Sequence, residues 1–100
     1  MVTINKLDKE ISKKVKELRK KLSLTTLDIS IHLNVSNAFV RNVAAGYKKY
    51  NIKHLYLIYC LFHELDPNVT FDMLMCDYNS DLIIELKDIK KVNNKYIKDE

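Results

Sequence analysis

Residues 36–42, SNAFVRN, bring together side chains that can form paired hydrogen bonds. The guanidinium of Arg41 can donate two hydrogen bonds to guanine O6 and N7, and the carboxamide of Asn37 or Asn42 can pair with adenine N6 and N7. Each such pair contributes about 1–3 kcal/mol of discrimination between bases. In the simpler alternatives, the asparagines are solvated helix residues and Arg41 pairs with a surface carboxylate. These residue types suit recognition of base edges if an element presents them to a DNA groove.

Three lysines follow this stretch and belong to a strongly basic half of the chain. Lys48, Lys49 and Lys53 can neutralise phosphates, which adds affinity and salt dependence without sequence preference. Residues 1–55 hold 12 Lys or Arg against four Asp or Glu, a net charge of +8, whereas residues 56–100 carry −4. A concentrated basic half is typical of a protein that binds a polyanion. The alternative is a lysine-rich solvated surface, produced in part by AT-rich codon usage.

The composition predicts a single small helical domain. Of 100 residues, 47% are hydrophobic, and the chain has one glycine and one proline, so tight turns are few. No apolar run reaches the roughly 18 residues that span a bilayer. The first ten residues, MVTINKLDKE, lack the apolar region of a secretory signal. We therefore expect a cytoplasmic protein that does not contact a membrane, and one that is nucleoid-associated if it binds DNA.

The cysteines and histidines do not predict a metal site or a catalytic site. Cys60 and His63 have C-x-x-H spacing, but a structural zinc site needs four ligands, and Cys76 and His54 are isolated. His32 and the other histidines have no nucleophile and orienting partner in a recognisable arrangement. There is also no glycine-rich phosphate loop. We expect no metal, no cofactor and no enzymatic activity, with core cysteines and surface histidines instead.

Apolar spacing predicts two helices ahead of this stretch. The first has a charged back, begins at Asp8 or Thr3, and has an apolar face made by Leu7, Ile11, Val15, Leu18 and Leu22. The second covers 26–33, with Thr25 as its N-cap. Its inward residues, four positions apart, are Ile29 and Leu33.

The stretch itself is predicted to form a third helix. Asn34 ends the second helix because asparagine tolerates the left-handed conformation. Ser36 caps the third helix, Val40 and Val43 face inward, and Gly46 closes it.

Two more helices are expected before residue 76. Asn51 caps a fourth helix over 52–65, which ends because Pro67 disfavours helix at Asp66. Its apolar stripe comprises Leu55, Ile58, Leu61 or Phe62, and Leu65. Thr70 caps a short fifth helix over 71–75, FDMLM, which buries Phe71 and Leu74.

The C-terminal segment, 77–100, is predicted to form an additional helix over 81–98, capped by Ser80. Its apolar positions follow coiled-coil spacing, and an asparagine at one of them favours a dimer of fixed register. The alternatives are a helix that packs on the bundle and a frayed tail. The residues proposed for the dimer interface are Leu82, Leu86, Ile89, Asn93 and Tyr96.

From Ile11 to about Met75 the chain resembles the Cro/CI-type helix-turn-helix family, also called Xre-like transcriptional regulators. The matching segments, in chain order, are KVKELRKKLSLT, TTLDISIHLNVS, NAFVRNVAAG, NIKHLYLIYCLFHEL and VTFDMLM. Ser30 stands where the family packs a small residue between its second and third helices. The chain departs from the family pattern with Asn34 in place of glycine, with Phe39 at a position that is usually small or polar, and with Ala44 and Ala45 before Gly46, where acidic and polar residues are usual.

The resemblance implies a five-helix, lambda-repressor-like bundle in which residues 1–76 form the DNA-binding domain. The amino-terminal half of the recognition helix would enter the major groove. The residues placed against bases are Ser36, Asn37, Ala38, Phe39, Arg41 and Asn42. Those placed against phosphates are Thr26, Lys48, Lys49 and Lys53. Phe39 has three alternatives, which are contact with a thymine methyl, packing on the fourth helix and anchoring of a protein partner. We expect Tyr47 and Tyr50 to pack against the loop.

The resemblance also implies a function. We expect a small sequence-specific regulator of transcription, a repressor from a phage, plasmid or other mobile element. It would bind a palindromic operator in double-stranded DNA as a homodimer, with a further regulatory protein as a possible partner. The alternative is a protein-binding module on the same scaffold, an anti-repressor or an inhibitor of a host defence protein. Phe39, Ala44 and Ala45 motivate this alternative, because they make the face more apolar than groove contact requires.

Overall fold

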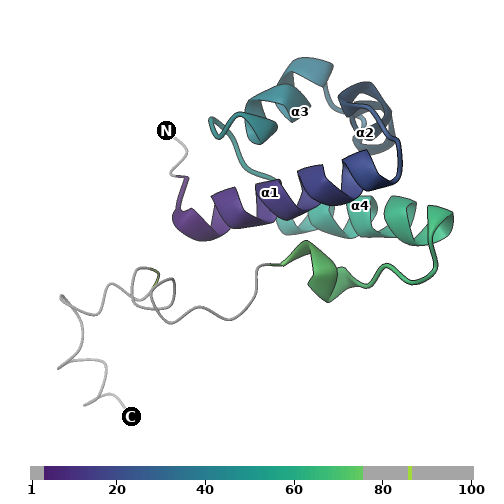
Figure 1. Ribbon diagram of the computed structural model, residues 1–100. Coiled ribbons are helices and arrows are strands. Elements are labelled where there is room, and N and C mark those ends of the chain that lie inside the picture. Colours follow the sequence, from purple (N-terminus) through teal and green to yellow (C-terminus); the bar gives the residue numbers. More distant parts are fainter. Residues whose placement is uncertain (1–3, 76–85, 87–100) are drawn as a thin grey trace, which may run out of the picture.

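The structure, a computed structural model, describes residues 4–75 and 86 (Figure 1). These residues contain no β-strand, which confirms the all-α prediction for this part of the chain. The elements are α1 (Lys6–Lys21), α2 (Thr26–Leu33), α3 (Asn37–Ala44), α4 (Ile52–Leu65) and the 3₁₀ helix η1 (Phe71–Leu74). The predicted fifth helix is therefore a single 3₁₀ turn. The predicted helix over 81–98 lies outside the described residues, and of its proposed interface only Leu86 is described.

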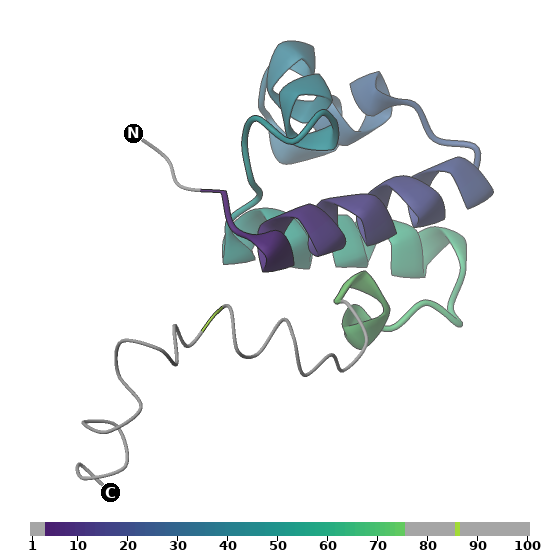
Figure 2. The same cartoon turned by 60° about the vertical axis from the view of Figure 1, so that its left-hand side comes forward.

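The helices lie on two sides of α1. Figures 1 and 2 show α2 and α3 on one side of α1 and η1 on the other, with the end of α3 over the first half of α1. The second helix packs on α3 and α4, and η1 packs on α1 and α4. The hydroxyl of Ser12 on α1 donates a hydrogen bond to the carbonyl oxygen of Val43 at 2.9 Å. The end of α3 is thus fixed to the middle of α1.

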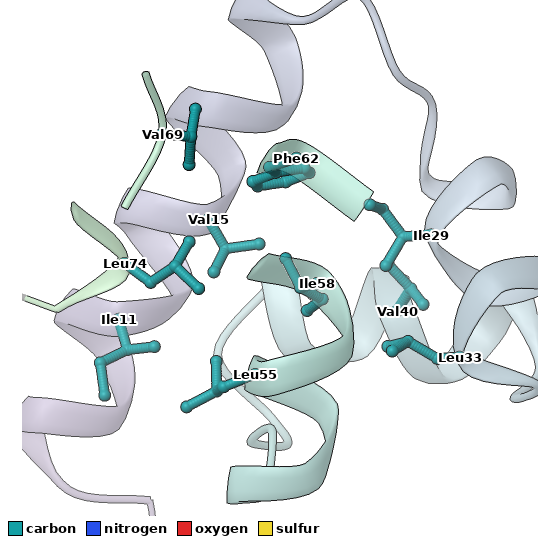
Figure 3. Close-up of a cluster of buried hydrophobic side chains, with 10 residues drawn as sticks. All are labelled: Ile11, Val15, Ile29, Leu33, Val40, Leu55, Ile58, Phe62, Val69 and Leu74. Carbon is teal, nitrogen blue, oxygen red and sulfur yellow. The ribbon is translucent and has the colours of Figure 1, made fainter. Parts of the chain in front are cut away.

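Ten buried apolar side chains fill the space between these elements (Figure 3). They come from every helix and from the connection before η1, and they are Ile11, Val15, Ile29, Leu33, Val40, Leu55, Ile58, Phe62, Val69 and Leu74. Phe62, and not Leu61, is the buried member of the α4 stripe. The prediction that Leu65 is buried was wrong, because this last residue of α4 is 51% exposed. Leu74 is fully buried as predicted, whereas Phe71 is half-buried.

Most of the predicted helix starts are confirmed, with α1 as the exception. Thr25, Ser36 and Asn51 cap α2, α3 and α4, each by accepting a backbone N–H three residues ahead. The cap of α1 is Asn5, whose side chain accepts from the Asp8 N–H at 2.8 Å while the Asp8 carboxylate accepts from the Asn5 N–H at 3.1 Å. Asp8 thus lies inside the first turn as the second half of a capping box. The Thr3 alternative lies outside the described residues.

The turn between α2 and α3 adopts the conformation expected from its residues. Asn34 has φ 58° and ψ 46°, the left-handed region, and it ends α2 as predicted. Ser30 is 2% exposed, and its carbonyl oxygen accepts the Val35 N–H at 3.0 Å. A larger side chain at Ser30 would push the two helices apart, since interiors are closely packed. Gly46, at φ 93°, closes α3 where L side chains are strained.

Candidate nucleic-acid interface

The exposed face of α3 carries a small set of side chains. Val40 and Val43 are 2% and 1% exposed, so they anchor the helix to the core as predicted. Ala38 and Arg41 are exposed, and Asn42 is half-buried. Arg41 forms no ion pair within residues 4–75, so the alternative of a surface carboxylate partner is not found there. Its guanidinium is available to a ligand.

Ser36 and Asn37 are less available than these three. The Ser36 hydroxyl oxygen accepts the Phe39 N–H at 3.0 Å, so one of its lone pairs serves the cap, while its O–H can still donate. The Oδ1 of Asn37 is buried and has no hydrogen-bond partner among the described residues. A paired contact with adenine needs both the oxygen and the nitrogen of a carboxamide. In this rotamer Asn37 can offer only its nitrogen, so Asn42 is the better placed of the two carboxamides for a paired contact.

Phe39 packs on the start of α4 and on the loop that precedes it. Its ring centroid lies 5.4 Å from that of His54 and 6.1 Å from that of Tyr50. The Lys48 ammonium lies 6.0 Å from the Phe39 centroid, within cation–π range. Among the three alternatives for Phe39, the structure therefore favours packing. We call Phe39, Tyr50 and His54 the ring cluster, and it braces α3 against α4.

The two loop tyrosines differ in exposure. Burial raises the pKa of Tyr50 to about 12, and the charge of Arg19 opposes this effect. Tyr50 therefore stays neutral at physiological pH and packs as predicted. Tyr47 is 76% exposed, so the expectation that it packs against the loop was wrong. It follows Gly46, whose positive φ turns the chain away from the helix.

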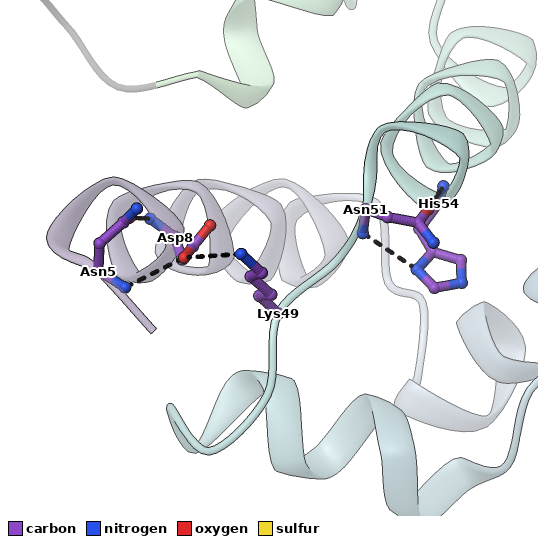
Figure 4. A network of polar contacts seen from close by, with 5 residues as sticks. All are labelled: Asn5, Asp8, Lys49, Asn51 and His54. Atoms are coloured by element: carbon purple, nitrogen blue, oxygen red, sulfur yellow. Dashed lines mark hydrogen bonds and ion pairs between the residues drawn. The ribbon is translucent and has the colours of Figure 1, made fainter. Parts of the chain in front are cut away.

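His54 is the titratable member of the ring cluster. Its Nδ1 accepts the Asn51 N–H at 3.2 Å (Figure 4), which requires an unprotonated Nδ1. Burial, and then the charge of Lys53, lower the pKa of His54 from its ordinary value. The folded protein therefore disfavours the imidazolium.

We predict that the free energy of unfolding falls as the pH drops from about 7.5 to about 5 and His54 is protonated. A base with a lowered pKa in the folded state binds fewer protons there than in the unfolded chain. The loss therefore begins near the ordinary pKa of 6.5 and is complete below the lowered folded value. Urea unfolding across this range should show a smaller decrease for His54→Gln than for the original protein. Equal decreases would place the titration in another group.

The four predicted phosphate-contacting residues differ in their exposure and in their contacts. Thr26 is the first residue of α2 and is half-buried, while Lys48 and Lys53 are exposed. The Lys49 ammonium lies 3.8 Å from the Asp8 carboxylate (Figure 4), which links the α3–α4 loop to the first turn of α1. The Lys49 side chain is 43% exposed and that of Asp8 is 15% exposed. Surface ion pairs contribute about 0–1 kcal/mol, so Lys49 can exchange its partner for a phosphate.

A groove that was not predicted from the sequence lies beside the end of α3. Lys9, Lys13 and Lys16 line it from α1, and Gly46 and Tyr47 line it from the other side, around a volume of about 460 Å³. The spacing of these lysines, four and three residues, is the available signal in the sequence. The spacing places them on one face of α1, although the opposing wall depends on tertiary packing.

The histidines and cysteines of residues 4–75 do not converge. No three His, Cys, Asp or Glu side chains there are grouped so that they could hold a metal ion. Cys60 is a half-buried free thiol. None of the described helices has the length and apolar character required to cross a membrane.

Comparison with known proteins gave no relatives. No protein-family model, no curated protein and no solved structure matches this chain.

Proposed function

We propose that this chain is a sequence-specific DNA-binding protein of the helix-turn-helix type that represses transcription. The observation that carries the proposal is the division of α3 into two faces. Val40 and Val43 are buried, whereas Ala38 and Arg41 are exposed and Asn42 is half-buried on the outer side. The three-residue connection through Asn34 and the similarity of residues 11–75 to the Cro/CI-type family support the same function.

In the proposed complex, the amino-terminal half of α3 enters the major groove. Arg41 donates to guanine O6 and N7, Asn42 pairs with an adenine, and Ala38 contacts a thymine methyl. Phe39 acts indirectly, because its ring braces α3 instead of contacting a base. Thr26 contributes the amino-terminal end of α2 to a phosphate. Lys48, Lys49 and Lys53 supply further phosphate contacts, which add affinity without sequence preference.

The proposed assembly is a homodimer on a palindromic operator. Two recognition helices of a dimer contact half-sites about 34 Å apart, one turn of B-DNA. Residues 81–98 are the proposed dimer seam, through Leu82, Leu86, Ile89, Asn93 and Tyr96. This part of the proposal rests on the sequence pattern alone.

A protein-binding module remains the second candidate. The specific observation in its favour is an apolar pair on the outer face of α2, where Leu27 is 52% exposed and Ile31 is 69% exposed. Exposed apolar residues one helical turn apart are suited to a protein partner. Phe39 also motivated this alternative, but its ring packs on Tyr50 and His54 and is therefore less accessible to a protein partner.

The test is selection of bound fragments from random duplex DNA at about 0.1 M salt, where phosphate contacts alone give weak binding. We expect a palindromic consensus with both G·C and A·T positions in each half-site, since Arg41 and Asn42 prefer different bases. Enrichment of a consensus that is not palindromic would support DNA recognition and reject the homodimer. Absence of any enrichment would reject DNA recognition in favour of the protein-binding module.

A further inference from the structure

The two exposed faces of α1 differ in charge. One face carries Lys9, Lys13 and Lys16 and borders the end of α3. The other face carries Lys14, Glu17 and Lys21 and, together with Asp72 and other residues around η1, lines a separate hollow. Acidic side chains accompany the lysines of the second face, whereas no acidic side chain lines the groove of the first. The positive potential of α1 is therefore concentrated on the side of α3.

The lysines of the first face are available to a ligand. All three side chains are exposed, and none forms an ion pair with another described residue. A lysine that stabilised the fold through a carboxylate would show such a partner. The opposite wall contributes Tyr47, whose exposed side chain carries a hydroxyl donor, and Lys48 follows it directly in the chain. The wall of the groove formed by residues 44–47 therefore leads along the chain into the basic α3–α4 loop.

We propose that the groove between α1 and the end of α3 is a second phosphate-binding track, which holds the DNA backbone that flanks the contacted major groove. The proposal rests on the proposed function and adds to it the residues Lys9, Lys13, Lys16 and Tyr47. Charge complementarity selects a polyanion as the occupant. The groove is lined by Ala44 of α3 and by the residues that follow it, so the same DNA molecule that meets α3 is the polyanion nearest to it.

The dimensions of the lysine row suit a duplex backbone. Lys9 and Lys16 are separated by seven residues, about 10 Å along a helix that rises 1.5 Å per residue. One strand of duplex DNA carries one negative charge per about 3.4 Å of its axis, so this distance corresponds to about three phosphates of one backbone. A row of three lysines can therefore contact phosphates in succession without distortion of the DNA.

The experiment compares two double variants of the full chain that remove the same charge from the same helix. The test variant is Lys13→Gln with Lys16→Gln, and the matched control is Lys14→Gln with Lys21→Gln. Affinity is measured over a range of salt concentrations for two duplexes of about 30 base pairs, some three turns of B-DNA, one with the selected consensus and one scrambled. Thermal unfolding of each variant monitors the fold separately.

We expect the test variant to reduce the slope of log affinity against log salt by about 1.8, since each phosphate contact contributes about 0.9. The reduction should be the same for both duplexes, so the preference for the consensus is retained. The control variant should change the slope by less than about 0.5, because its lysines contact no phosphate. Equal changes in the two variants would overturn the proposal and leave the lysines with a general electrostatic role.

The outcomes also separate this inference from the proposed function. If selection finds no consensus but the slope difference persists on the scrambled duplex, the track stands and sequence-specific recognition fails. If the consensus is found and the slope difference is absent, sequence recognition stands and the track fails. If the original protein binds neither duplex even at about 50 mM salt, both fail, and an acidic protein becomes the occupant to test.

Discussion

Replacement of both Arg41 and Asn42 by alanine should abolish the preference for the operator while weak, salt-sensitive binding to any duplex remains. These two side chains provide the paired base contacts in the proposed complex. Loss of two contacts worth about 1–3 kcal/mol each corresponds to a decrease of roughly 30-fold to 10⁴-fold in specific affinity. Affinities for the consensus and scrambled duplexes, measured at one salt concentration, provide the comparison.

The fold should survive this double substitution, because Arg41 is exposed and forms no described ion pair. A control is Lys21→Ala with Asn68→Ala, which also removes one positive charge and one carboxamide, here from two exposed positions outside α3. The control should retain the preference for the consensus. Specific binding that persists in the Arg41 and Asn42 variant would move the base-contacting face away from α3.

The substitution Phe62→Ala should have the largest effect on stability. Phe62 is 0% exposed and is the largest fully buried side chain of the described core. Truncation of a buried phenylalanine costs about 3–5 kcal/mol through lost burial and the cavity that remains. Small domains have total stabilities of about 5–15 kcal/mol, so the substitution removes a large fraction of the stability and leaves a domain at the lower end of that range partly unfolded at room temperature. Urea unfolding, monitored through the helix content, measures the difference in the free energy of unfolding between this variant and the original protein.

Leu65→Ala is the matched control on the same helix. Leu65 belongs to the apolar stripe predicted from the sequence, but it is 51% exposed at the end of α4. Its truncation should cost less than about 1 kcal/mol, because half of the side chain already contacts water. A similar loss of stability in both variants would mean that the end of α4 is buried against a part of the chain beyond Met75.

Local patterns predicted the helices because their causes are local. The caps Thr25, Ser36 and Asn51 act on residues three positions ahead, and Asn34 takes a left-handed conformation that its own side chain permits. The helix predictions were wrong at two places, where a second residue competes for the cap position or where a short helix takes another form. Asn5 displaced Asp8 as the cap of α1, and residues 71–74 form a 3₁₀ turn where a fifth α-helix was predicted.

The candidate site was less predictable because its geometry depends on contacts between elements. The sequence leaves three alternatives for Phe39, and the choice depends on Tyr50 and His54. Similarly, the inward turn of the Asn37 oxygen depends on how the start of α3 sits on its neighbours. The sequence shows that three lysines of α1 recur at helical spacing. It does not show that residues 44–47 lie opposite them and complete a groove.

The separation of α3 into positions that anchor the helix and positions that face outward has an evolutionary consequence. The helix has only eight residues, and the positions that hold it in place are Phe39, Val40 and Val43. Ala38, Arg41 and Asn42 take no part in that anchoring, so drift at these positions is nearly neutral for folding. Under the proposed function, a lineage that carries this scaffold would therefore acquire a new DNA target through changes at these positions. The stability of the protein and the choice of its target would then evolve as independent traits.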